Sequence, residues 1–231
     1  MPNALLPAEP DGTPWYSDEE LEVVRLSSKS HWDLPIEIGR KTVHSPGESP
    51  DAAGVDGPED RSRTRNHDEI RFWADYIHSW RSHYIYDDDG ETGGLARRDL
   101  FVIAGDQNSD PNDGDSITGA IQQLVDNRLI NTKVVPSSAG AVEQAELQGD
   151  NNVDHLSNPA FDTADFGEAQ FGGPGNLRVD HPGAWLSADG IAVDLMVPEE
   201  LAGAGSRGAR ANLDTIAGSM ITLIEDLLAD L

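Results

Sequence analysis

The segment Leu100-Phe-Val-Ile-Ala-Gly-Asp-Gln-Asn-Ser-Asp-Pro111 holds the features that decide the fold. Its first five residues form a continuous apolar run between Asp99 and Gly105, which predicts a strand buried on both faces. A polar loop follows directly, and loops at strand ends present side chains to a crevice. Asp106 and Asn108 are two residues apart, so they point to the same side of an extended segment. A carboxylate beside an amide suits a hard cation such as Mg²⁺, whereas the alternative interpretation is an ordinary turn.

Three helices are predicted around this strand. Ser17 begins a capping box for a short helix that ends near Ser27, and a further helix begins near Ser116. The third helix is capped by Asn66 or His67. Its apolar residues follow a 3.6-residue period: Ile70, Trp73, Ala74, Ile77 and Trp80.

The remaining segments alternate between strand patterns and loop patterns. Residues 35–43 alternate apolar and polar side chains around a glycine, which predicts a strand or hairpin, and residues 191–197 predict a second buried strand. Residues 45–65 and 137–176 are rich in turn-forming residues and predict long irregular loops. The mixture indicates an α/β or α+β fold with an unusual amount of loop.

The C-terminal segment 209–231 has the most regular helical pattern in the chain. A helix there would have one apolar stripe: Leu213, Ile216, Met220, Leu223, Ile224, Leu227 and Leu231. This stripe predicts a face that is covered either by the chain's own sheet or by a second copy of the chain. Of these two arrangements we expect the homodimer.

The charge balance excludes several classes of function. The chain has 16 Lys and Arg against 42 Asp and Glu, a formal net charge of −26, so it offers little to bind nucleic acid. It has no cysteine, no signal-like start and no apolar run long enough for a membrane span, and we expect it to be cytoplasmic without membrane contact. The acidic, lysine-poor composition resembles that of proteins from extreme halophiles; the alternative is an ordinary acidic protein.

The loop Gly105-Asp-Gln-Asn108 after its apolar strand resembles the GDxN element of the endonuclease/exonuclease/phosphatase superfamily, which comprises metal-dependent phosphoesterases. Five other stretches resemble the phosphatase-like or phytase-like branch of that superfamily, in matching order: residues 25–33, 56–60, 65–76, 119–124 and 175–180. The resemblance implies part of a two-sheet sandwich with outer helices over residues 1–180. Residues 181–231 form a divergent segment.

The resemblance also implies a reaction and its residues. Asp106 and Asn108 match the pair that positions the attacking water and the scissile phosphate, and Asp106 with Asp180 would hold Mg²⁺ or Mn²⁺. His67 and Asp110 are candidate supporting residues. Small phosphoesters are expected as substrates rather than DNA, because the chain has no basic groove.

Three parts of the family pattern are not found in this sequence. They are the upstream strands with the Asn and Glu that bind metal, a Ser-His-Pro element, and a C-terminal Ser-Asp-His. Where Ser-His-Pro is expected, His44-Ser45-Pro46 stands in a loop-like context. These departures leave a second interpretation open: a truncated, catalytically inactive remnant that acts as a binding module or has no function.

Overall fold

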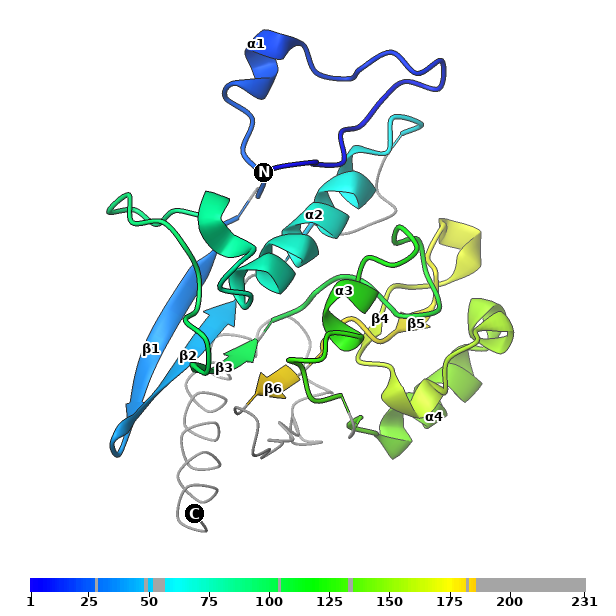
Figure 1. The fold of residues 1–231 in the computed structure, drawn as a ribbon. Helices are drawn as coiled ribbons and strands as arrows, with labels where there is room; N and C mark the ends of the chain where they lie inside the picture. The colour runs from blue at the N-terminus through cyan, green and yellow to red at the C-terminus, as the bar shows by residue number, and fades with distance from the viewer. Residues whose placement is uncertain are drawn as a thin grey trace.

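The computed structural model describes residues 1–27, 29–47, 50–51, 57–103, 105–132, 135–181 and 183–185. It confirms a mixed architecture of strands and helices. Four strands form one sheet in the order β1-β2-β3-β6 (Figure 1), where β3 is parallel to β2 and the other neighbours are antiparallel. Their bounds are β1 Trp32–Ile38, β2 Lys41–Gly47, β3 Leu100–Ile103 and β6 Gly183–Trp185.

Strands β1 and β2 form a hairpin that is longer than the predicted one. Gly39 has a φ of 63° at the first position of the two-residue turn, a conformation that glycine adopts readily. The strand continues through His44-Ser45-Pro46, so the prediction that these residues lie in a loop is wrong. Pairing with β1 extends to Gly47, and this tertiary pairing overrides the turn preference of the local sequence.

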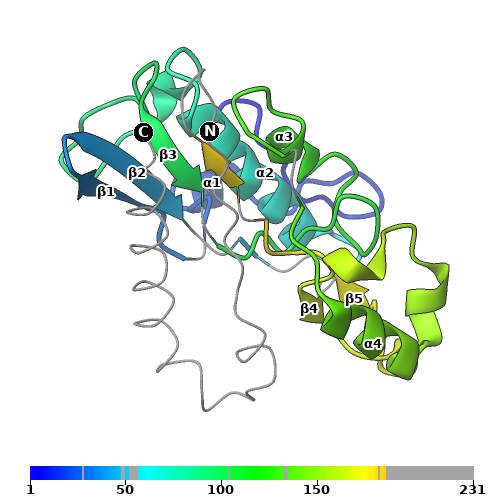
Figure 2. The same ribbon diagram turned by 90° about the horizontal axis from the view of Figure 1, so that it is seen from below.

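Helix α2 (Arg61–Tyr76) packs on one face of the sheet (Figure 2). Its apolar face joins Phe101 and Ile103 of β3 in the main core, as the periodicity predicts: Ile70, Trp73, Ala74 and the following Ile77 are buried. Trp80 was predicted on the same face but is 64% exposed, because the helix ends before it.

The N-terminus of α2 was predicted wrongly. The cap residue is Asp60, so Asn66 and His67 lie inside the helix rather than at its start. Asp60 has a left-handed backbone and its side chain makes no capping hydrogen bond. The first turns carry polar side chains, and the apolar period therefore gives no sign of them.

The region 122–177 contains more regular structure than predicted. Helix α3 (Gln122–Val125) is shorter than the helix expected from Ser116, although Ile121 and Leu124 still reach the core. The supposedly irregular residues 137–176 contain helix α4 (Ala139–Gln148), capped by the side chain of Ser138. They also contain most of a two-stranded ribbon of β4 (Ala164–Asp165) and β5 (Asn176–Leu177). Short 3₁₀ helices complete the regular structure of the described residues: η1 Ser82–Tyr84, η2 Asp150–Asp154, η3 Pro159–Phe161 and η4 Ala169–Phe171.

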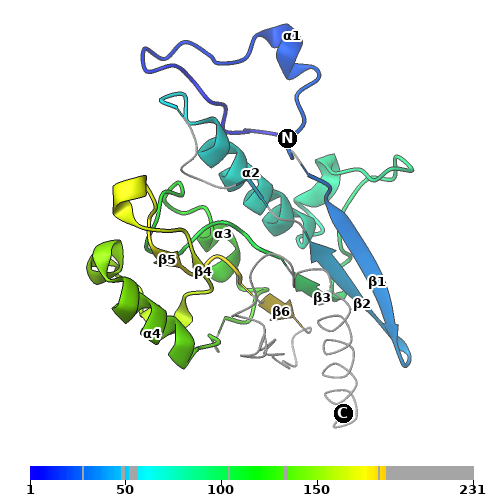
Figure 3. The same ribbon diagram turned by 180° about the vertical axis from the view of Figure 1, so that it is seen from behind.

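The N-terminal residues 1–27 form an extended arm beside α2 (Figures 1 and 3). Helix α1 (Asp18–Leu21) begins with the predicted capping box, in which the Ser17 side chain accepts from the Glu20 N–H. The helix ends before Ser27, and Val23 beyond it is 76% exposed.

Among the described residues, no helix is long and apolar enough to cross a membrane. The predicted strand 191–197 and the predicted helix 209–231 lie outside the described residues, as do Ala104 and most of the divergent segment.

Candidate functional site

Asp106 and Asp180 face each other on a continuation of the β3–β6 pair. In the sheet Ile103 pairs with Gly183, and the bridge between Asp106 and Asp180 lies three residues further along each segment in the same register. Beyond the bridge, the Gln107 N–H donates to the carbonyl oxygen of Val179 at 2.9 Å. The two aspartates thus occupy a non-hydrogen-bonded position, where Cα atoms are about 4.5 Å apart and side chains are closest.

Burial alternates along both segments of this ribbon. Asp106 and Asp180 are partly exposed, whereas their neighbours are buried: Gln107, Ser109, Val179 and His181. Asn66 of α2 donates to the carbonyl oxygen of Gln107 at 2.9 Å. Since side chains of an extended segment alternate between faces, the two carboxylates lie on the face opposite the buried side chains of Gln107 and Val179.

The electrostatics of the pair disfavour two negative charges. Burial raises the pKa of Asp106, and the charge of Asp180 raises it further, although the Asn108 N–H and the Lys29 charge oppose this. Burial also raises the pKa of Asp180, and a hydrogen bond with the Thr163 side chain partly offsets it. A cation between the carboxylates would relieve this strain, so the arrangement is suited to a hard, oxygen-binding ion.

Asn108 takes part in a turn. Its N–H donates to Oδ1 of Asp106 at 2.7 Å, and its backbone is left-handed with a φ of 48°. Its Nδ2 donates to the carbonyl oxygen of Pro50 at 2.9 Å. The turn interpretation of this loop is therefore confirmed. This turn does not exclude a site, because the Asp106 side chain remains partly exposed and an ion can reach it.

Asp110 connects the two segments that carry the carboxylates. Its Oδ1 accepts from the N–H groups of Asn112 and Asp113 at 2.8 and 2.9 Å, and its Oδ2 accepts from the Arg178 N–H at 2.8 Å. Asp110 thus holds the backbone of the two segments together, and none of these contacts is with Asp106 or Asp180.

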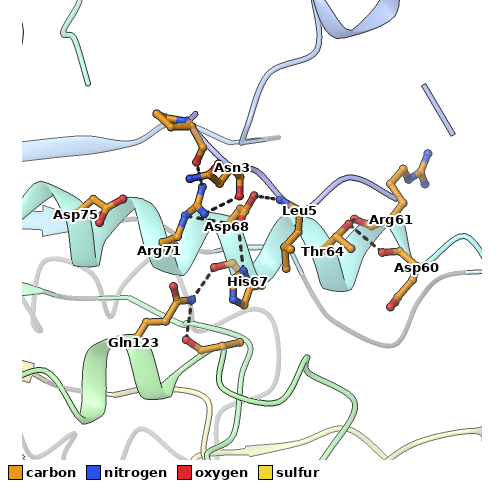
Figure 4. Close-up of polar contacts among 12 residues, drawn as sticks. Asn3, Leu5, Asp60, Arg61, Thr64, His67, Asp68, Arg71, Asp75 and Gln123 are labelled. Atoms are coloured by element: carbon orange, nitrogen blue, oxygen red, sulfur yellow. Dashed lines mark hydrogen bonds and ion pairs between the residues drawn. The ribbon is translucent and has the colours of Figure 1, made fainter. Parts of the chain in front are cut away.

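His67 lies in a different contact network (Figure 4). Its Nδ1 is 3.0 Å from Oδ1 of Asp68, and its carbonyl oxygen accepts from Nε2 of Gln123 at 2.9 Å. Asp68 in turn accepts from the Leu5 N–H at 2.6 Å and so attaches the N-terminal arm to α2. No contact of His67 involves Asp106 or its partners, so the structure does not bring this candidate to the site.

Sequence reasoning missed Lys29, whose charge lowers the pKa of Asp106 and which therefore lies near that carboxylate. Its Nζ is 3.4 Å from the carbonyl oxygen of Pro50 and 3.7 Å from Oδ1 of Asp51. Asp51 is itself fixed to α2, because its N–H donates to Oε2 of Glu69 at 2.6 Å and its Oδ2 pairs with Arg65 at 3.0 Å. The signal available in the sequence was the scarcity of lysine: the chain has three lysines against 42 acidic residues.

Comparisons with known proteins do not add to this description. No family model, no curated protein and no solved structure matches the chain. Within the part of the chain that the structure describes, no group of three or more His, Asp or Glu side chains is placed to hold a metal ion. An ion at the Asp106–Asp180 pair would therefore complete its coordination with water or substrate oxygens.

Proposed function

We propose that the chain binds Mg²⁺ or Mn²⁺ at Asp106 and Asp180 and hydrolyses small phosphoesters. The observation that carries the proposal is the bridge that sets these two carboxylates opposite each other. It agrees with the resemblance of this segment to metal-dependent phosphoesterases, and the proposal extends to a partial two-sheet sandwich for residues 1–180.

The donor set fits such an ion. Mg²⁺ prefers oxygen ligands and is commonly held by one or two carboxylates together with waters and substrate phosphate. Bound there, it would supply charge stabilisation for the phosphate and a more acidic water. The raised pKa values of both carboxyls show that two negative charges are unfavourable there, and this favours cation binding. A bound cation replaces the repulsion between the carboxylates with two attractions.

The chain's own residues would orient the substrate. Asn108 is held rigidly by Pro50 and by Asp106, and an amide N–H₂ group has a second hydrogen to donate to a phosphate oxygen or to a water. Thr163 fixes the Asp180 backbone, since its Oγ1 accepts from the N–H groups of Val179 and Asp180 at 3.0 Å. The net charge of −26 favours a small phosphoester over a nucleic acid.

A second candidate function is binding without turnover. No imidazole hydrogen-bonds to Asp106 or Asp180 within the described ranges; His181, next to Asp180, donates from Nε2 to the Ser109 carbonyl oxygen instead. General acid–base catalysis typically contributes on the order of 10²–10⁴-fold to the rate, so a site without such a group would bind a phosphoester and turn it over slowly or not at all.

Turnover of p-nitrophenyl phosphate in about 3 M KCl tests the proposal, because salt at that level screens the acidic surface. We expect hydrolysis that requires Mg²⁺ or Mn²⁺ and falls by about 100-fold or more in Asp106→Asn. The matched control is Asp88→Asn, which changes an exposed turn carboxylate and should leave turnover unchanged. Calorimetric Mg²⁺ binding without turnover would favour the binding module. Absence of both would contradict the proposal.

A further inference from the structure

We infer that Lys29 binds the anionic phosphate group of the substrate beside the Asp106–Asp180 pair. This inference rests on the proposed function and extends it by assigning the substrate class, a phosphomonoester with a dianionic terminal phosphate, and the side chain that selects it.

The charge of the site requires such a residue. Two carboxylates in a chain of net charge −26 repel a phosphate dianion, and a single divalent ion neutralises only the carboxylates. Lys29 is a basic residue whose charge acts on Asp106, since it lowers the pKa of that carboxyl. Lys29 shares Asp51 with Arg65, and three further arginines pair with acidic side chains elsewhere: Arg63 with Asp60, Arg71 with Asp68 and Arg81 with Asp75.

The geometry places Lys29 next to Asn108. The carbonyl oxygen of Pro50 lies 3.4 Å from Lys29 Nζ and 2.9 Å from Asn108 Nδ2. The two nitrogen atoms are therefore no further apart than the sum of these distances. Two donors at that separation can approach different oxygens of one tetrahedral phosphate.

The ammonium is both anchored and accessible. Asp51 at 3.7 Å and the Pro50 carbonyl hold it in position, and α2 fixes Asp51 through Arg65 and Glu69. The Lys29 side chain is nevertheless 47% exposed, so an incoming anion can reach it. A compact ammonium with three donors suits a phosphate oxygen, and the hydrogen bond formed is charge-assisted.

Binding of inorganic phosphate in the presence of Mg²⁺, measured by calorimetry on the full chain, tests the inference without requiring turnover. We expect Lys29→Gln to raise the Kd for phosphate by about tenfold or more, and Lys29→Arg to retain most of the affinity. Lys41→Gln is the matched control, because Lys41 is an exposed lysine at the start of β2. It should leave the Kd unchanged.

A Mg²⁺ titration without phosphate distinguishes loss of the Lys29 charge from general damage to the fold in Lys29→Gln. Removal of the ammonium should leave Mg²⁺ affinity equal or higher, since Lys29 repels the cation. Opposite shifts for phosphate and Mg²⁺ support the inference; an unchanged phosphate Kd in Lys29→Gln, or equal loss of both ligands, overturns it. If the wild-type chain binds phosphate through Lys29 without hydrolysing the ester, only the proposed hydrolysis fails. If the wild type binds no phosphate, the role of Lys29 is refuted.

Discussion

At the scale of single residues, the Asp106–Asp180 pair opposes folding. Both carboxyls have a raised pKa, chiefly because they are partly buried, and they sit at the closest kind of cross-strand position. Buried groups with perturbed pKa values cluster at functional sites, where stability is given up for binding or catalysis. The pair should therefore show opposite effects on stability and on cation binding.

We predict that Asp106→Asn stabilises the metal-free protein by on the order of 1 kcal/mol at neutral pH, after allowance for solvent screening. The pKa of Asp106 is higher in the folded state, so its charge destabilises the fold above that pKa and ceases to do so as the pH falls through it. Urea denaturation should show the variant as more stable at neutral pH and equal to wild type in acid. A variant that is less stable than wild type at neutral pH would contradict the conclusion that the Asp106 charge destabilises the fold.

Asp162 gives a second pH prediction. Burial, with the charges of Asp110 and Asp113, raises its pKa to about 6. Because this folded-state value exceeds the unfolded one, wild-type stability should gain a component as the pH falls from neutral through about 6. Asp162→Asn should remove that component, whereas Asp154→Asn, an exposed carboxylate on η2, should keep it. Thermal unfolding midpoints of wild type and both variants across this pH range test the prediction. An unchanged pH dependence in Asp162→Asn would contradict it.

At the scale of elements, the sequence predicts what is locally encoded. The apolar run of β3 and the periodic face of α2 need no knowledge of the remaining chain, and both are confirmed for the described residues. Helix α4 was missed because only Ala145 in it is buried and Leu147 is 76% exposed, so no apolar stripe exists. Ser138 before it and Gly149 after it were the available signals.

The residues of the candidate site likewise fall into those that the local sequence predicts and those that it does not. Asp106 and Asn108 could be proposed because they follow a recognisable strand, and Asp180 because of its resemblance to a family strand. Lys29 could not, because its position depends on Pro50 and on the neighbouring Asp51, which α2 holds in place. Such a contact arises from three segments that are distant in sequence.

Helix α4 provides a test at this scale. Oγ of Ser138 accepts from the N–H groups of Gly140 and Ala141 at 3.1 and 3.4 Å. Ser138→Ala should therefore lower the free energy of unfolding by about 1 kcal/mol, the usual effect of losing an N-cap. Ser137→Ala is the control at the adjacent exposed position. Equal effects of the two substitutions in urea denaturation would show that the cap does not stabilise the helix.

At the scale of the whole molecule, the net negative charge is the main influence that we expect on the stability of the folded state. A net charge of −26 with few lysines makes the compact state repel itself at low ionic strength. We predict that the circular dichroism of the folded state is lost on dialysis from about 3 M to about 0.1 M KCl. An unchanged cooperative unfolding transition at the lower salt would contradict the halophilic interpretation of the composition.

The homodimer also belongs to this scale and remains a prediction, since residues 209–231 lie outside the described residues. If their apolar stripe joins two chains, light scattering with size-exclusion chromatography in high salt should give a dimer. Deletion of residues 209–231 should then abolish the dimer. It should also cause aggregation, because the apolar surface that the stripe had covered becomes exposed. A folded full-length monomer would show that no such dimer forms.

The ribbon that carries the carboxylates joins segments far apart in the chain: the His181–Ser109 hydrogen bond spans 72 residues. An ion held by both Asp106 and Asp180 would be a removable cross-link across that loop. It would have to leave before the ribbon could open, and its release rate would thus enter the lifetime of the native state. Chelation should accordingly shorten the time to unfolding in a protease or denaturant jump, even where the equilibrium stability changes little.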